Sequence, residues 1–280
     1  MFKNWRFKKQ EKPKQYAGNN KGLMQLNEDF SKDYQHEQNA LQHVIRQAEA
    51  ILADNPFMTY TERHPIFSYI KVLTDYIQNE QAVSLLKNGS DNPTVHNKEY
   101  NIVSAYYHAI DNVLMYNLYG KSKRYEVDNI VISNATDPMI AKIWNTDRIV
   151  DNFKNIGSGI VRTHYLNNGI KRENRFEYQG INHMAQYFYP LGITMVYNGN
   201  HSIFTGMNKG EGHIKVNEVY DVSYLYDKFR FDGMYLIDTE TEEKERIFFE
   251  IGAIFEIGRL LLNHHDVFSK DIQNIVDKGK

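Results

Sequence analysis

The sequence contains no cysteine among its 280 residues. The chain can therefore form no disulfide, cannot hold zinc through thiolates and cannot use a thiol as a nucleophile. Its stability must come from an apolar core, and 41% of the residues are hydrophobic, as in an ordinary soluble protein. The lack of cysteine agrees with a cytoplasmic location, which we expect for this protein.

Several other signals are also absent. No apolar run approaches the roughly 18–20 residues that span a bilayer, and the opening MFKNWRFKKQEKPK has no apolar segment like that of a secretory signal. The formal net charge of −2 gives no general attraction to nucleic acid. The chain also lacks the phosphate-binding loop of nucleoside triphosphatases, the Gly-x-Ser-x-Gly motif and the dinucleotide fingerprint. We therefore expect no membrane partner and none of these enzyme classes.

The pattern of apolar residues predicts an α+β protein in two parts. Apolar residues recur at three- and four-residue steps over 26–53, from His64-Pro65 onward and over 97–118, which predicts helices. After residue 121, short β-branched segments alternate with helical ones. We predict a flexible basic arm over 1–22, a helical domain over 23–120 and a small mixed α/β domain with a C-terminal helix over 121–280.

The second part has several short elements. The apolar and β-branched patterns predict its strands and helices, and the pair Asn168-Gly169 predicts the turn of a hairpin. The expected elements are strands over 125–133, 193–197, 213–222 and 234–238, helices over 137–157 and 241–265, and a hairpin over 160–178.

The arm at the start of the chain allows two interpretations. It is either a solvated tail or a segment that contacts an acidic partner, a nucleic acid or a membrane surface. Its basic residues are Lys3, Arg6, Lys8, Lys9, Lys12 and Lys14, with one acid, Glu11, and the aromatic residues Phe2, Trp5 and Phe7.

The most specific signal is YNGNHSIFTGMNKGEGHIKV, residues 197–216. If Gly199 turns the chain sharply after a strand and a helix begins near His201, the first N–H groups of that helix are unpaired and can bind an anion. In this interpretation Asn200 or Ser202 caps the helix, His201 contacts a phosphate oxygen and Lys209 adds positive charge. The alternative is a plain strand–turn–helix in which His201 makes structural hydrogen bonds.

Carboxylates and further cations could complete such a site. Glu211 lies nearest the stretch and could hold Mg²⁺ or activate water, which makes His201 and Glu211 the catalytic candidates. Asp232 and Glu250 are available by position only. We predict no resident metal, and we interpret His264-His265 as the end of a helix. The candidate cations of the second part are Arg148, Arg162, Lys171, Arg172 and Arg175.

The stretch also resembles the phosphate-binding box of the ParB/sulfiredoxin superfamily, in which a strand leads through Gly-x-His-Arg into a short helix. Gly199, Asn200 and His201 occupy its positions here, Gly206 is the small residue that follows, and the strand 189–199 is similar to the one that precedes the box. The same Asn-Gly-Asn-His-Ser stretch is similar to that of an uncharacterised bacterial family.

The resemblance implies a phosphate or nucleotide pocket in an α/β domain, with Arg148 as a looser match to an earlier arginine of the superfamily. The arginine that follows the histidine there is Ser202 here, which weakens the case for nucleotide hydrolysis. The cysteine of sulfiredoxin falls at Asn200, so its thiol chemistry is excluded.

Two hypotheses follow. In the first, the protein binds a nucleotide or a nucleic-acid end at residues 199–202, hydrolyses phosphoryl or phosphodiester bonds and belongs to a plasmid- or phage-related bacterial system. In the second, it is a non-catalytic protein-binding factor in defence, counter-defence or plasmid maintenance. In both, the helical N-terminal part offers a surface for a protein partner or a homodimer. The two differ in whether His201, Glu211 and an arginine meet in one pocket.

Overall fold

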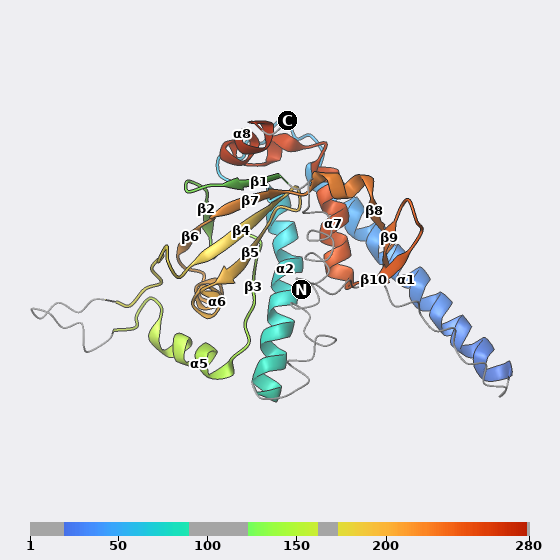
Figure 1. The fold of residues 1–280 in the computed structure, drawn as a ribbon, viewed down its shortest axis with the longest axis horizontal. Helices are drawn as coiled ribbons and strands as arrows, with labels where there is room; N and C mark the ends of the chain where they lie inside the picture. Colours follow the sequence, from blue (N-terminus) through green and yellow to red (C-terminus); the bar gives the residue numbers. More distant parts are fainter. Residues whose placement is uncertain (1–19, 90–122, 162–172, 279–280) are drawn as a thin grey trace, which may run out of the picture.

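The computed structural model describes residues 20–89, 123–161 and 173–278. The predicted α+β class is confirmed, since N-terminal helices precede a region of mixed sheets (Figure 1). Three predicted segments lie wholly or partly outside the described residues. They are the predicted arm over 1–22, of which residues 1–19 are not described, the predicted helix over 97–118, and most of the predicted hairpin over 160–178. Among the described residues, no helix is both long and apolar enough to cross a bilayer.

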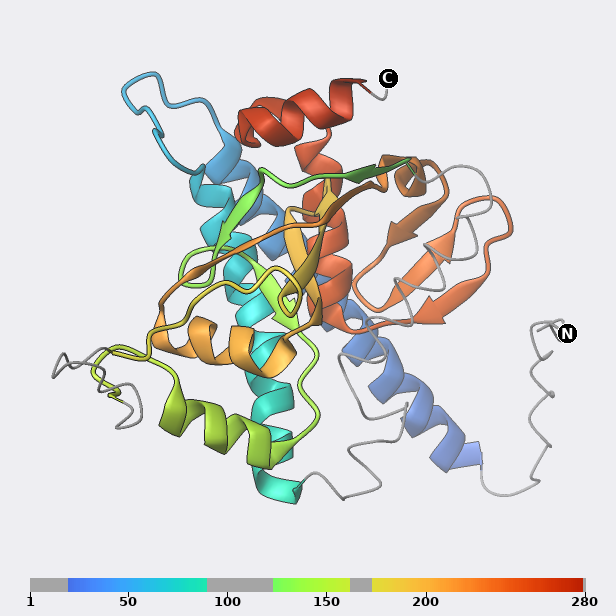
Figure 2. The same ribbon diagram turned by 60° about the vertical axis from the view of Figure 1, so that its left-hand side comes forward.

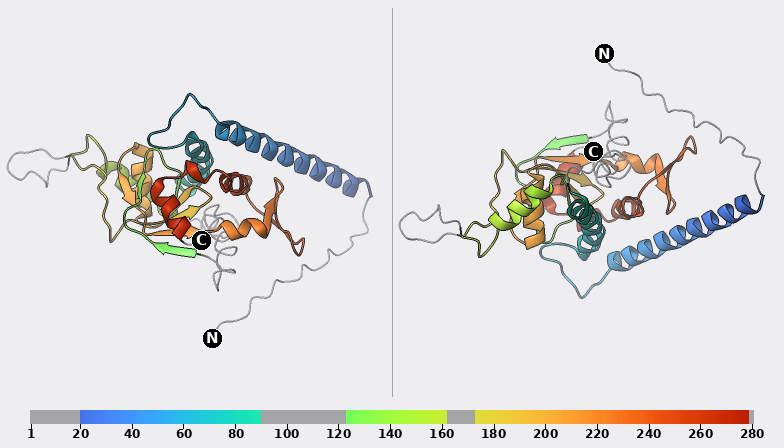
Figure 3. Two further views of the ribbon diagram at one scale, coloured as in Figure 1. Left: turned by 90° about the horizontal axis from the view of Figure 1, so that it is seen from above. Right: turned by 90° about the horizontal axis from the view of Figure 1, so that it is seen from below.

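The described part of the chain begins with two helices. The first, α1, is long and extends well beyond the rest of the molecule (Figure 3). The second begins where the sequence predicts, because Pro65 occupies its first turn and the Nδ1 atom of His64 accepts a hydrogen bond from the backbone N–H of Ile66 at 3.2 Å. The bounds are α1 Asn20–Leu52 and α2 Pro65–Asn88.

A five-stranded sheet forms the centre, with the strand order β1-β7-β4-β5-β3. The pairs β3/β5 and β4/β7 are parallel, and β4/β5 and β1/β7 are antiparallel. Its strands are β1 Lys123–Glu126, β3 Met139–Ala141, β4 Met184–Tyr189, β5 Ile193–Asn198 and β7 Glu218–Asp221.

Two smaller sheets and further helices complete the fold. The smaller sheets are β2 Val131–Ser133 with β6 His213–Lys215, and β8 Phe229–Phe231 with β9 Tyr235–Asp238 and β10 Lys244–Arg246. The helices are α5 Thr146–Asn155, α6 Asn200–Lys209, α7 Phe249–Leu261 and α8 Lys270–Lys278, with short 3₁₀ turns η2 Ser223–Asp227 and η3 His265–Val267. The helices α5 and α6 lie side by side, and α7 lies next to α1 and α2 (Figure 2).

The helix α2 covers the free edge of β3. The side chain of Gln78 accepts the N–H of Ala141 at 2.6 Å, and the amide of Gln81 donates to the carbonyl of Ile143 at 2.8 Å. An uncovered sheet edge offers unpaired backbone groups to other chains. These two glutamines therefore close one edge of the sheet.

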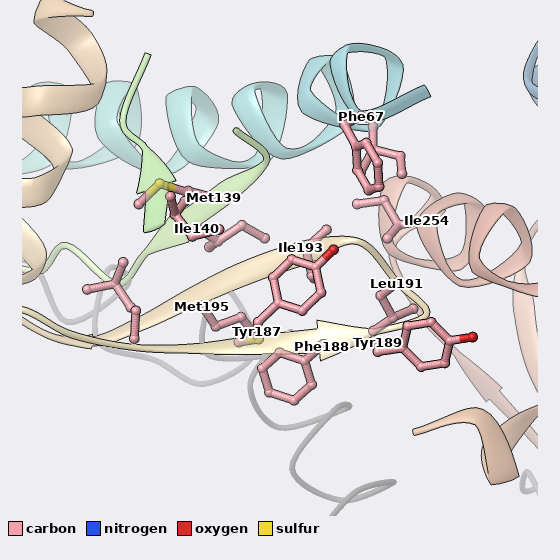
Figure 4. Packing of buried hydrophobic residues seen from close by; sticks show 14 of the residues in the cluster. Phe67, Met139, Ile140, Tyr187, Phe188, Tyr189, Leu191, Ile193, Met195 and Ile254 are labelled. Atoms are coloured by element: carbon pink, nitrogen blue, oxygen red, sulfur yellow. The ribbon is translucent and has the colours of Figure 1, made fainter. Parts of the chain in front are cut away.

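One apolar core joins the helical and the α/β parts. Tyr187 and Phe188 point to opposite faces of β4, and Phe67 of α2 and Ile254 of α7 approach the turn that follows this strand (Figure 4). The core cluster also includes Ala48 of α1. The predicted boundary near residue 121 lies outside the described residues, but the residues on its two sides share this core.

Several predicted elements have different bounds. The predicted helix over 137–157 is wrong in its first part, which forms β3, and the predicted strand over 125–133 is two strands. The predicted helix over 241–265 begins later, because its acidic start forms the turn and strand β10. A three-residue buried strand such as β3 carries no period that separates it from a helix.

Candidate functional site

The turn between β5 and α6 has the strand–turn–helix geometry that the sequence predicts. Gly199 adopts the left-handed conformation, with φ 75° and ψ 19°, and α6 begins at the next residue. A Cβ atom at position 199 would lie 2.5 Å from Cδ2 of His183 and 2.7 Å from the carbonyl oxygen of Asn182. Both the backbone angle and the crowding therefore require glycine.

The side chains of Asn200 and His201 point into the protein, where they are only 4% and 5% exposed. Asn200 accepts the backbone N–H of Lys142 at 2.7 Å. The Nε2 atom of His201 lies 3.3 Å from the N–H of Trp144 and 3.1 Å from that of Asn145, and accepts from both. These contacts fasten the start of α6 to the segment between β3 and α5.

Because Nε2 of His201 accepts hydrogen bonds, the proton of the ring sits on Nδ1 and the imidazole is neutral. Burial lowers its pKa to about 4, and the nearby guanidinium of Arg148 contributes, against the opposing effect of the hydrogen bond from Asn145. The ring also makes a T-shaped contact with Trp144, at a centroid distance of 4.4 Å. At neutral pH this histidine offers no positive charge to a phosphate.

Ser202 contacts a second buried histidine that the sequence interpretation did not connect to it. Nδ1 of His183 accepts the N–H of Gln179 at 3.1 Å, so its proton lies on Nε2, which donates to the hydroxyl of Ser202 at 3.0 Å. That hydroxyl in turn donates to the carbonyl of Gly199 at 3.0 Å. His183 therefore cannot act as a base toward Ser202 in this arrangement, because its nitrogen donates the hydrogen bond.

Lys209 and Glu211 lie at the other end of α6. The ammonium of Lys209 donates to the carbonyl of Phe153 at 2.9 Å and to that of Ile156, so it satisfies carbonyls at the C-terminal end of α5. The carboxylate of Glu211 accepts the backbone N–H and the hydroxyl of Ser158 and the backbone N–H of Phe176, at 2.7–3.0 Å.

The electrostatics of Glu211 agree with these contacts. Partial burial opposes ionisation, but the hydrogen bonds from Phe176 and Ser158 outweigh it and lower the pKa of the carboxyl group. The group is therefore a charged acceptor at neutral pH and not a proton-sharing acid. Its oxygens are directed at the backbone of two loops.

His201 and Glu211 do not meet. The helix α6 has 10 residues, or about 15 Å of length, and the two side chains lie near its opposite ends. Arg148 is exposed on α5 near His201, whereas Arg175 is paired with Glu173 at 2.7 Å. The other candidate cations, Arg162, Lys171 and Arg172, lie outside the described residues.

The described residues contain no group of three His, Asp or Glu side chains that could hold a metal ion. The other two candidate carboxylates, Asp232 and Glu250, lie in other parts of the fold. Asp232 accepts the hydroxyl of Tyr34 at 2.6 Å, and burial raises the pKa of Glu250 on α7. A cavity of about 340 Å³ lies beside Lys123, Asp221 and Ser223, and no residue of the stretch 199–202 lines it.

These features define an α+β protein with a mixed five-stranded sheet and a strand–turn–helix whose polar side chains are directed inward. Residues 26–268 match a family described as "Family of unknown function (DUF6710)", and the chain belongs to that family. No curated protein and no solved structure matches the chain.

Proposed function

We propose that this chain is a non-catalytic binding protein that acts through contact with a protein partner. The observation that carries the proposal is that His201 and Glu211 lie at opposite ends of α6, where each accepts backbone N–H groups. A hydrolytic site needs its base, its cation and its water to converge on one reacting atom. The described side chains of the stretch instead connect α6 to its neighbours.

A phosphate-bearing ligand at the start of α6 is the second candidate, in keeping with the resemblance to the ParB/sulfiredoxin superfamily. Two observations favour it: Gly199 leaves α6 without a side-chain cap, and Arg148 stands near His201 with its side chain exposed. The ligand would be a nucleotide or a nucleic-acid end, and any reaction would be phosphoryl or phosphodiester hydrolysis with Mg²⁺ as the cofactor.

One experiment separates the two candidates. Inorganic phosphate, ATP and a short DNA duplex are tested for binding and hydrolysis, with and without Mg²⁺, on the wild type and on Arg148→Ala. The matched control is Arg230→Ala, which removes another exposed arginine whose ion pair with Glu242 is loose, at 3.5 Å. The first proposal expects no hydrolysis and no binding that depends on Arg148. Hydrolysis that is lost in Arg148→Ala and kept in Arg230→Ala would establish the second candidate.

A further inference from the structure

The outer face of α2 carries an exposed apolar stripe, which consists of Val72, Tyr76, Val83 and Leu86. These side chains are 47–65% exposed. Their spacing of four, seven and three residues places them on one face of the helix. The opposite face of α2 provides core residues such as Ile70 and Ile77, so the stripe is additional to the face that holds the fold together.

An acidic rim borders this stripe, formed by Glu80 of α2, which is four residues from Tyr76 and three from Val83, and by Glu250 of α7, the helix that packs against α2. Glu37 of α1 lies near Glu250. The carboxylates of Glu80 and Glu250 stand close enough to Tyr76 to raise the pKa of its phenol. Burial raises the pKa of Glu250, and Glu80 and Glu37 raise it further. The like charges of the rim therefore repel one another, and a cation placed beside them would reduce that repulsion.

Among the described residues, positive charge near the stripe is limited. Lys71 is bound to Asp75 one turn away, at 2.7 Å, and Lys87 lies at the C-terminal end of α2. A second copy of this chain would bring its own Glu80 against the rim, which like-charge repulsion disfavours. The occupant that fits both the apolar stripe and the rim is apolar on one side and basic beside it.

We propose that the outer face of α2 binds an amphipathic helix of a partner protein, whose apolar stripe packs on Val72, Tyr76, Val83 and Leu86 and whose flanking Lys or Arg residues face the acidic rim. The inference deepens the proposed function and depends on it. An amphipathic helix recognises a partner through anchors at three- and four-residue spacing, which is the spacing that α2 offers. The opposite charges then favour basic over acidic helices.

The test uses two synthetic helical peptides of about 18 residues, or roughly five turns. Both carry the same leucine stripe, flanked by lysine in one and by glutamate in the other. Fluorescence anisotropy with the full chain measures both affinities. We expect the lysine peptide to bind about tenfold more tightly, and Glu80→Gln to reduce that preference. Equal affinity for the two peptides would overturn the proposal.

Matched variants locate the binding surface. The double variant Val72→Ser/Val83→Ser should weaken the binding of the lysine peptide about tenfold, because it removes two anchors. The control is Val131→Ser, which changes a side chain of similar exposure, 53%, on β2. If the α2 double variant binds the lysine peptide as tightly as the wild type does, or if the control loses as much affinity, the binding surface is wrongly assigned.

The absence of native cysteine allows a labelling test of what covers the face. Val83→Cys should react with maleimide about as fast as Ile181→Cys, a loop position that is 94% exposed in the wild type. The lysine peptide should slow the labelling of Val83→Cys and leave that of Ile181→Cys unchanged. Slow labelling of the free chain would mean that another segment of the chain or a second copy already covers α2, which excludes the proposed partner. If these tests fail and the protein hydrolyses neither nucleotide nor DNA, the binding surface on α2 is rejected and the non-catalytic proposal remains.

Discussion

The start of α6 and the outer face of α2 use their side chains in opposite ways. At α6, Asn200 and His201 are polar and point inward to backbone N–H groups. On α2, Val72 and Val83 are apolar and point to solvent. Buried polar groups that are fully hydrogen-bonded hold a fold together, whereas exposed apolar groups in one patch mark a contact surface. The most specific sequence signal therefore lies where α6 is connected to its neighbours, whereas the exposed apolar stripe lies on α2, where the sequence predicts only a helix.

The largest expected effect is that of His201→Ala. The variant leaves the N–H groups of Trp144 and Asn145 without their acceptor and opens a cavity beside Trp144. Together these changes should lower the free energy of unfolding by about 3 kcal/mol, as measured by urea denaturation. The control His213→Ala changes an exposed histidine on β6 and should cost less than about 0.5 kcal/mol. A loss below about 1 kcal/mol for His201→Ala would mean that its hydrogen bonds are dispensable for stability. The contrast between a structural start of α6 and an exposed face of α2 would then be wrong.

The second expected effect is a dependence of stability on pH. In the unfolded chain a histidine titrates near pH 6.5, whereas the pKa of His201 in the folded protein is about 4. Below pH 6.5 the unfolded state binds the proton first, so stability falls as the pH decreases. For His201 the fall is about 3 kcal/mol between pH 6.5 and 4, and its contribution is fully present above that range.

The difference between the wild type and His201→Gln isolates this effect. Burial also lowers the pKa values of His64 and His183, so both proteins should lose stability on acidification. The free energies of unfolding, measured by urea denaturation at several pH values, should fall more steeply for the wild type. Parallel curves for the two proteins would show that His201 accepts a proton in the folded state as readily as in the unfolded one.

Much of the fold could be predicted from the sequence, because local chemistry decides it. Pro65 after His64 sets the start of α2, and the glycines at 199 and 210 bound α6, where both adopt the left-handed conformation. The strand β3 could not be predicted, since its three buried residues depend on their pairing with β5 far along the chain. β4 was not predicted either, because its sequence MAQYFY is buried over most of its length and does not alternate clearly.

The position of the candidate site could be predicted, but the orientation of its side chains could not. The sequence places a turn at Gly199 and a helix after it, as observed. The backbone N–H donors that fix His201 and Glu211 come from Trp144, Asn145 and Phe176, which are 35 to 57 residues away in sequence. A side chain at the start of a helix can bind a ligand or an adjacent loop, and only the tertiary structure decides which.

A smaller effect is expected at the other end of α6. Glu211→Ala removes the acceptor for Ser158 and Phe176 and should cost about 1–2 kcal/mol, because the carboxylate is only partly buried and water can replace it. Thermal and urea unfolding measure the loss. Glu240→Ala, at an exposed turn, is the control and should change little. If Glu211→Ala keeps full stability but abolishes a hydrolytic activity, the carboxylate is catalytic and the interpretation of this end of α6 as a junction is wrong.

The smallest expected effect belongs to α2 and completes the comparison. Val83→Ser exchanges an exposed apolar side chain for a small polar one and should change the free energy of unfolding by less than about 0.5 kcal/mol. Ile77→Val on the same helix removes one methylene from a side chain that is 1% exposed, and it should cost about 1 kcal/mol. Urea denaturation of both variants measures the contrast. Equal losses would mean that Val83 is covered within the folded chain, in which case α2 has no free face and the contact surface must lie elsewhere.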